Sequence, residues 1–177
     1  MAKIRRPNTR QGQPRQGQSQ QGQPPDAYGK ALTLLVRREH SAKELKSKLA
    51  RRGLDADAAS AAVAKLQAKD FQSDARFGEM LVRSRIEGGY GERWIVAELR
   101  THGIGDAKAR ELIEAADPDW PDLIRRQLRR RYGARPAAGL AERAKRAAFL
   151  LRRGFDAATV QSITRAQGLD SAADELD

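Results

Sequence analysis

Arginine is concentrated in one segment of the chain, residues 125–165, at spacings that align side chains along helices. The segment holds twelve basic and only two acidic residues. The net charge of the whole chain is +11, so this segment accounts for most of the excess of basic residues. Arg125 and Arg129 are four residues apart, as are Arg126 and Arg130, so each pair would share one stripe of a helix. Guanidinium groups bind carboxylate and phosphate groups through two parallel hydrogen bonds. The segment therefore predicts a surface that binds an external polyanion.

The predicted binding surface takes its basic side chains from two consecutive helices. On the first, Ile124 and Leu128 would face the core. On the second, an apolar stripe is expected to face the core, opposite the basic residues, and consists of Leu140, Ala144, Ala147 and Leu151. The alternative is that the arginines only keep an alanine-rich helix soluble. The residues predicted to bind are Arg125, Arg126, Arg129, Arg130, Arg131, Lys145, Arg146, Arg152 and Arg153.

No set of residues in the sequence predicts catalysis. The chain has no cysteine, which excludes thiolate metal sites and cysteine nucleophiles. His40 and His102 are far apart and lack partners at metal-ligand spacing, so we interpret both as helix-end residues. The run Gly88–Gly91 lacks the lysine and hydroxyl of a phosphate-binding P-loop and predicts a turn. We therefore expect no enzyme activity, no metal or other cofactor and no small-molecule substrate.

The sequence also predicts a location. No segment approaches the roughly 20 apolar residues that span a bilayer, and the basic residues near the N-terminus have no apolar stretch behind them. A chain without cysteine is compatible with a reducing compartment. We expect a soluble cytoplasmic protein that does not contact membranes.

The elements that must position these residues form an internal repeat. Glycine recurs at positions 53, 103 and 154, in steps of 50 and 51 residues. Each glycine follows a basic or imidazole residue and precedes a large apolar one, in the triplets Arg52-Gly53-Leu54, His102-Gly103-Ile104 and Arg153-Gly154-Phe155. A glycine just past a helix can adopt the left-handed conformation that ends it, and the next apolar side chain packs on the last turn. The period therefore predicts one structural unit used three times.

Apolar residues recur in phase with these glycines. A leucine lies four positions before each glycine and an apolar residue lies nine positions after it; these residues are Leu49, Leu99, Leu150, Ala62, Leu112 and Ile163. Such offsets are typical of buried helix faces. The residues that define the repeat are Leu45, Leu49, Gly53, Ile95, Leu99, Gly103, Leu150, Gly154 and Phe155.

The composition favours helices throughout. Thirty alanines, with four phenylalanines, three tyrosines and two tryptophans, suit closely packed helices better than a sheet. We predict an all-α fold of three tandem three-helix repeats, residues 26–72, 73–118 and 119–169, stacked as an elongated, curved, solenoid-like array. The Gln-, Gly- and Pro-rich basic segment 1–25 is predicted to be a disordered tail, and the acidic segment 170–177 a frayed end.

Three groups of residues resemble, in order along the chain, the motifs of the bacterial RecX regulatory proteins. The first group is Ala31-Leu32, Leu35, Arg38-Glu39-His40-Ser41, Glu44-Leu45, Lys48-Leu49 and Arg52-Gly53. The second is Gly91, Ile95, Glu98-Leu99 and Gly103-Ile104, and the third is Leu150-Leu151-Arg152-Arg153-Gly154-Phe155. The resemblance covers about residues 26–168. Two features depart from it: Glu92 stands where the family commonly has proline, and the Gln-Gly-Gln tail is no part of the family pattern.

The resemblance implies a fold and a function. RecX proteins consist of three tandem three-helix repeats, in agreement with the period. They bind the RecA recombinase in the groove of its filament on DNA and inhibit its ATPase, strand-exchange and co-protease activities, which restrains recombination and the SOS response. The resemblance thus implies a non-enzymatic negative regulator whose partners are the RecA filament and, weakly and without sequence preference, DNA. A general DNA-backbone-binding protein that acts without RecA is the alternative.

Overall fold

The computed structural model describes residues 26–174, and side-chain burial through residue 166. Within this range the chain forms nine helices and no strand: α1 (Ala27–Leu35), α2 (Ala42–Ala50), α3 (Ala56–Ala68), α4 (Asp74–Glu87), α5 (Glu92–Thr101), α6 (Asp106–Ala115), α7 (Trp120–Tyr132), α8 (Gly139–Arg152) and α9 (Ala157–Asp174). The last helix, α9, extends into the segment 170–177 that was predicted to fray. The predicted disordered tail, residues 1–25, lies outside the described residues, as do residues 175–177.

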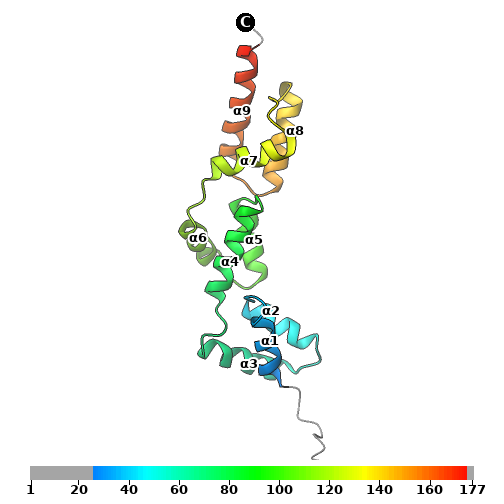
Figure 1. The fold of residues 1–177 in the computed structure, drawn as a ribbon, viewed down its shortest axis with the longest axis vertical. Coiled ribbons are helices and arrows are strands. Elements are labelled where there is room, and N and C mark those ends of the chain that lie inside the picture. The colour runs from blue at the N-terminus through cyan, green and yellow to red at the C-terminus, as the bar shows by residue number, and fades with distance from the viewer. Residues whose placement is uncertain (1–25, 175–177) are drawn as a thin grey trace, which may run out of the picture.

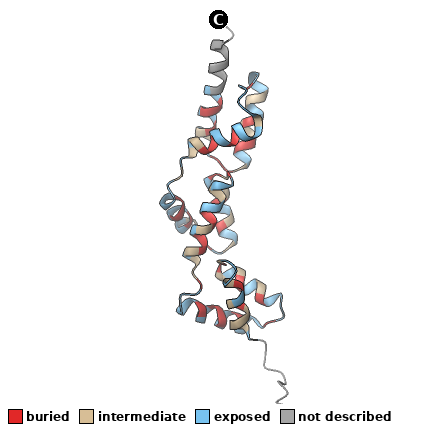
Figure 2. Cartoon of the chain, viewed as in Figure 1, coloured by how far each residue is buried: buried red, intermediate tan, exposed pale blue. Residues whose placement is uncertain are grey.

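The helices form three groups of three that follow one another along the long axis of the molecule (Figure 1). Each group encloses its own apolar core, and buried residues gather inside each group (Figure 2). Fully buried members are Leu45 and Leu49 in the first core, Ile95 and Leu99 in the second, and Ile124 and Leu150 in the third. The predicted all-α class with three three-helix repeats is confirmed.

The middle helix of each repeat ends at one of the periodic glycines. These glycines have φ values of +76° at position 53, +88° at position 103 and +84° at position 154. The N–H that follows each glycine donates to the carbonyl of the leucine four residues before it: Leu54 to Leu49 at 3.3 Å, Ile104 to Leu99 at 3.1 Å and Phe155 to Leu150 at 3.3 Å. This bond closes the helix as a Schellman motif, and the apolar side chain after each glycine is buried.

Polar side chains start six of the described helices, α1, α2, α3, α4, α7 and α9. Their caps, which accept hydrogen bonds from the first N–H groups of the helix, are Asp26, Ser41, Asp55, Ser73, Asp119 and Asp156. Such caps satisfy donors that a helix start leaves unpaired. In contrast, α5 and α6 begin at glycines, Gly91 and Gly105, which have no capping side chain.

The first and second repeats meet through side chains. Ser41 at the start of α2 lies beside His102 at the end of α5, with 3.4 Å between Oγ and Nδ1. Arg76 on α4 pairs with Glu39, which precedes α2, at 2.9 Å. This junction therefore depends on groups that reach across from one repeat to the other.

The second and third repeats meet through the main chain. The N–H of Gly91 donates to the carbonyl of Arg153 at 2.7 Å, and the N–H of Arg93 donates to the carbonyl of Gly154 at 3.1 Å. The start of one middle helix again meets the end of the next, but here two backbones are in direct contact.

Candidate functional site

The arginine stripe lies on α7, and the apolar face of α7 decides its direction. Ile124 and Leu128 are buried in the third core, as predicted. The exposed residues on the opposite side of the helix include Arg125, Arg126, Arg129 and Arg130. Arg126 pairs with Asp122 at 3.0 Å. Within the described residues, the other three make no ion pair, hydrogen bond or aromatic contact, which leaves their guanidinium groups available to an external anion.

Two further predicted residues, Arg131 and Arg153, lie over aromatic rings. Their guanidinium carbons are 4.6 Å and 5.1 Å from the centre of the Phe149 ring. Arg153 also donates to the carbonyls of Gly88 and Gly89, at 3.0 Å each. Arg131 is exposed, but Arg153 is half-buried and joins two repeats. Arg153 therefore has a structural role besides its charge.

Arg146 differs from the prediction because it does not face solvent. Its side chain is 2% exposed and pairs with Glu142 at 2.7 Å. The guanidinium also donates to the carbonyls of Arg135 at 3.0 Å and Pro136 at 3.3 Å, and lies 5.0 Å from the centre of the Tyr132 ring. These partners use the donors of Arg146 inside the third repeat, so it is not part of the exposed basic surface.

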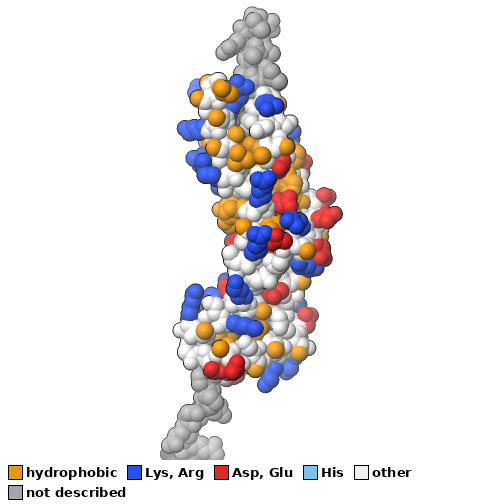
Figure 3. Space-filling view, turned by 180° about the vertical axis from the view of Figure 1, so that it is seen from behind, with side chains coloured by type: hydrophobic (Ala, Val, Ile, Leu, Met, Phe, Trp, Pro, Cys, Tyr) orange, Lys and Arg blue, Asp and Glu red, His pale blue; other side chains and the backbone are white. Residues whose placement is uncertain are grey.

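The predicted inner face of α8 is also wrong. Leu140 is 77% exposed and Leu151 is 44% exposed, while the core is filled by Phe149 and Leu150. The helix is rotated so that Arg146 reaches its carbonyl partners, and the apolar stripe consequently faces outwards. The two remaining predicted cations of α8, Lys145 and Arg152, are exposed and lack an ion pair among the described residues. Figure 3 shows hydrophobic side chains in orange beside blue basic ones on the third repeat.

The two acidic residues of the basic segment are both engaged. A hydrogen bond from the Arg146 guanidinium, and another from the N–H of Ala138, lower the pKa of Glu142. The N–H of Thr159 lowers the pKa of Asp156, which caps the start of α9. Both carboxylates are thus ionised at neutral pH and satisfied within the fold, and they do not pair with the exposed arginines of α7.

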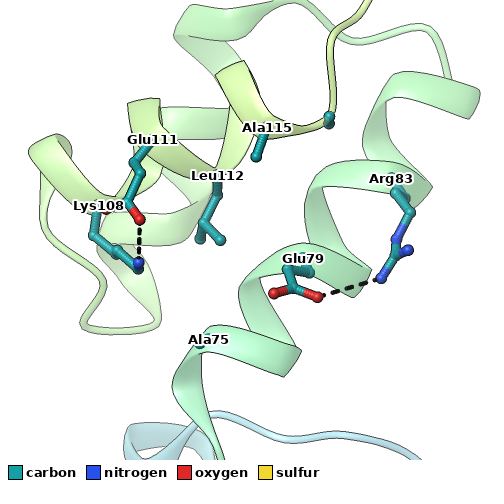
Figure 4. A pocket seen from close by; sticks show the side chains of 8 residues that line it. Ala75, Glu79, Arg83, Lys108, Glu111, Leu112 and Ala115 are labelled. Atoms are coloured by element: carbon teal, nitrogen blue, oxygen red, sulfur yellow. Dashed lines mark hydrogen bonds and ion pairs between the residues drawn. The ribbon is translucent and has the colours of Figure 1, made fainter.

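A groove lies in the second repeat, between α4 and α6, with a volume of about 420 Å³ (Figure 4). Its charged side chains pair with one another: Glu79 with Arg83 at 3.6 Å and Lys108 with Glu111 at 2.6 Å. Because each charge has its partner on the same helix, this groove offers little to a charged ligand. The third repeat is the stronger candidate for binding.

The described residues offer neither a metal site nor a membrane-spanning helix. They contain no cluster of three or more histidine, aspartate or glutamate side chains that could hold a metal ion. None of the helices described has the length and apolarity needed to cross a membrane.

Sequence reasoning missed Arg143 and Arg165. Together with Leu140 they line a groove between α8 and α9. Arg165 lies outside the two helices that were predicted to carry the basic surface, and Arg143 lies beside the stripe of α8 that was predicted to face the core. One signal in the sequence could have indicated them. Phe149 and Leu150 form a second apolar face on α8, and if this face is the buried one, the Leu140 stripe and the neighbouring Arg143 face solvent.

The fold and the basic surface define a helical-repeat protein with a cationic face on its third repeat. Family models match the chain in three consecutive parts: RecX first three-helix domain at residues 27–66, second at 73–116 and third at 118–164. The chain therefore belongs to the RecX family of regulatory proteins.

Individual relatives agree with this assignment. The chain is 47% identical to the regulatory protein RecX of Stenotrophomonas maltophilia (strain R551-3) over 136 residues, 77% of this chain and 83% of the relative. It is 44% identical to that of Xanthomonas axonopodis pv. citri (strain 306), over 77% of this chain and 84% of the relative.

Two crystal structures share the fold. One, a regulatory protein RecX, has a TM-score of 0.68 at 22% identity and covers 78% of this chain and 70% of its own. The other, RecX from Lactobacillus salivarius, has a TM-score of 0.61 at 24% identity and covers 81% of this chain and 95% of its own.

Proposed function

We propose that the protein is a negative regulator of the RecA recombinase. It lies along the RecA–DNA filament in the cytoplasm and inhibits ATP hydrolysis, strand exchange and co-protease activity. It acts by binding and not by catalysis. Family membership supports RecA as the partner. The observation that carries the mode of binding is the set of exposed arginines on α7 that have no partner among the described residues, in an elongated array.

The physical basis of inhibition is restraint of another polymer. An elongated stack of repeats presents a long surface and can contact several positions along a filament groove. Its arginines bind phosphate or carboxylate oxygens of the groove. A ligand that binds one filament conformation more tightly shifts the equilibrium towards it, so a bridge between neighbouring RecA subunits opposes the motions that hydrolysis needs.

The decisive test is a titration of RecA ATPase activity on single-stranded DNA. Wild-type protein should suppress hydrolysis at equimolar amounts or below. The variant in which Arg125, Arg126, Arg129 and Arg130 are replaced by alanine should require at least about tenfold more protein for the same inhibition, with unchanged helix content by circular dichroism. Unchanged hydrolysis across a broad titration of the wild type would reject the proposal.

A matched control removes the same charge from the first repeat. Arg37, Lys46, Arg51 and Arg52 are exposed and have no ion pair among the described residues. Replacing these four by alanine should leave inhibition within about twofold of wild type, because screened charges far from the contact contribute little. If this control loses as much inhibition as the α7 variant, net charge matters and the placement on α7 is wrong.

The alternative, a general DNA-backbone-binding protein, rests on the same free arginines. It predicts binding to single-stranded DNA without RecA that persists at physiological salt. The logarithm of the binding constant should then fall with the logarithm of salt concentration with a slope of about −0.7 per phosphate contacted. Fluorescence anisotropy with labelled DNA separates the two functions, since weak binding without RecA counts against the alternative.

A further inference from the structure

The third repeat exposes an apolar stripe that its own core does not use. Leu140, Ala144, Ala147 and Leu151 follow one another at spacings of four, three and four residues, so they lie along one side of α8. Leu140 and Leu151 are 77% and 44% exposed, and Ala144 is exposed as well. This spacing is typical of a helix that packs against another helix. Among the described residues, no helix covers it.

The stripe continues into a groove between α8 and α9. Leu140, Ala144 and Ala147 line one side, and Gln161, Thr164 and Arg165 of α9 line the other, around a volume of about 330 Å³. The small side chains of the two alanines let an incoming backbone approach closely. Over the eleven residue steps from Leu140 to Leu151, a helix rises about 16 Å, enough for three turns of a second helix.

The charges around the groove have one sign. Arg143 and Arg165 lie on its border, and neither has an ion pair among the described residues. Lys145 and Arg152, also exposed, lie farther round the same helix. Among the residues whose side chains the structure describes, no aspartate or glutamate lines the groove. It differs in this respect from the groove between α4 and α6, where every basic group has an acidic partner.

We infer that the groove between α8 and α9 is a docking site for an acidic amphipathic helix of a protein partner. The partner's apolar residues, at positions i, i+4 and i+7, pack on Leu140, Ala144 and Ala147, and its carboxylates pair with Arg143 and Arg165. A second copy of this chain would place like charges opposite one another. Nucleic acid contacts proteins mainly through its phosphates and base edges and presents no helix face with apolar side chains at this spacing.

The inference deepens the proposed function, on which its choice of RecA as the partner rests. It assigns the groove to protein and leaves the arginine stripe of α7 to phosphate. The two surfaces lie on different helices of one repeat, so they can be tested separately. The exposure of Leu140 and Leu151 means that replacing them removes little from the core.

The first test uses a designed peptide as the probe. A fluorescein-labelled helical peptide with leucine at positions i, i+4 and i+7 and glutamate on its other faces should bind the wild type saturably. The same peptide with lysine for glutamate should bind at least about tenfold more weakly. The variant Leu140→Gln with Leu151→Gln should lose at least about tenfold in affinity for the glutamate peptide, as should Arg143→Gln with Arg165→Gln. Chemical-shift changes in a ¹H–¹⁵N spectrum should centre on Ala144 and Ala147.

The second test uses RecA and DNA in parallel. The leucine variant should bind RecA at least about tenfold more weakly while its affinity for single-stranded DNA stays within twofold of wild type. The four-arginine variant of α7 should bind single-stranded DNA at least about tenfold more weakly, while its affinity for RecA stays within about twofold of wild type. Thermal denaturation of each variant checks that the fold is intact.

The outcomes distinguish the two proposals. If neither peptide binds saturably, or if both glutamine variants bind the glutamate peptide like the wild type, the groove assignment is overturned even where RecA inhibition stands. If the peptide binds and the variants lose it while wild-type protein leaves RecA unaffected, the groove stands and the proposed function falls. If sedimentation shows a dimer that the leucine variant abolishes, the occupant is a second copy and the inference is wrong.

Discussion

The two junctions between repeats join equivalent parts of the fold by different chemistry. At the first, side chains of Ser41 and His102 meet; at the second, the backbone of Gly91 meets that of Gly154. Main-chain hydrogen bonds with no side chain between them fix the distance between two helices, whereas side chains can change rotamer and titrate. From this comparison we expect the second and third repeats to form the more rigid pair and the first repeat to be joined adjustably.

The open end of the array extends this comparison. Gly88 and Gly89 lie four and three residues before the start of α5, and their carbonyls accept from Arg153 of the following repeat. The equivalent carbonyls before α8, of Arg135 and Pro136, meet no further repeat among the described residues and accept from Arg146 of their own repeat. Arg146 therefore donates to these carbonyls as Arg153 does at the second junction, and these contacts accompany its burial.

The largest effect is expected for Gly91→Ala at the second junction. An added Cβ would lie against the N–H of Phe155 and the carbonyl carbon of Gly154, which are backbone atoms and cannot rotate away. The free energy of unfolding should fall by at least about 3 kcal/mol, measured by urea denaturation. The matched control is Gly105→Ala, also a glycine at a helix start, where nothing lies within 4 Å of the added atom. If both variants lose the same free energy of unfolding, the glycine at position 91 is explained by its place at a helix start and not by its contact with the third repeat.

The second prediction concerns Arg146→Met, which keeps the volume and removes the charge. Two loop carbonyls and one carboxylate lose their buried donor, so the free energy of unfolding should fall by about 2–3 kcal/mol. Arg143→Met, on the same helix with one long hydrogen bond of 3.4 Å, should stay within about 0.5 kcal/mol of wild type. If calorimetry shows an unchanged free energy of unfolding for Arg146→Met, the stabilising role of Arg146 at this end of the third repeat is contradicted.

The third prediction tests the first junction with Gly103→Ala. The left-handed φ of +88° costs an alanine about 1 kcal/mol, and the nearest atoms are flexible carbons of Lys43 at 3.7 and 3.8 Å. The loss should therefore match that of Gly53→Ala, which has φ +76° and open surroundings. If Gly103→Ala is as damaging as Gly91→Ala, the first junction is as tightly packed as the second and the comparison fails.

The smallest effect is expected from pH at the first junction. Burial opposes ionisation of Glu44, but hydrogen bonds from Arg38 and His40 outweigh it and lower the pKa of this carboxyl. Glu44 therefore stabilises the fold at pH values above the ordinary glutamate pKa, and this contribution is lost as pH falls through the lowered value. Thermal melts of wild type and Glu44→Gln should differ by no more than about 1 kcal/mol at pH 7 and converge in acid. A difference that grows towards low pH would reverse the assigned sign.

The sequence by itself determined the repeat and its helices. The left-handed glycines at positions 53, 103 and 154, and the leucines that pack beneath them, are set by interactions within a few residues, which a sequence pattern records directly. The outward direction of Arg125 and Arg129 was predictable for the same reason, because Ile124 and Leu128 give α7 one apolar face.

Only the tertiary structure decided which side of α8 is buried. The helix has two apolar faces, one with Leu140 and Leu151 and one with Phe149 and Leu150, and periodicity alone cannot rank them. The choice depends on carbonyls of the preceding loop, which draw Arg146 inwards and turn the leucine stripe to solvent. A contact between segments ten residues apart or in different repeats leaves no local pattern, so the burial of Arg146 and the exposed groove could be found only in three dimensions.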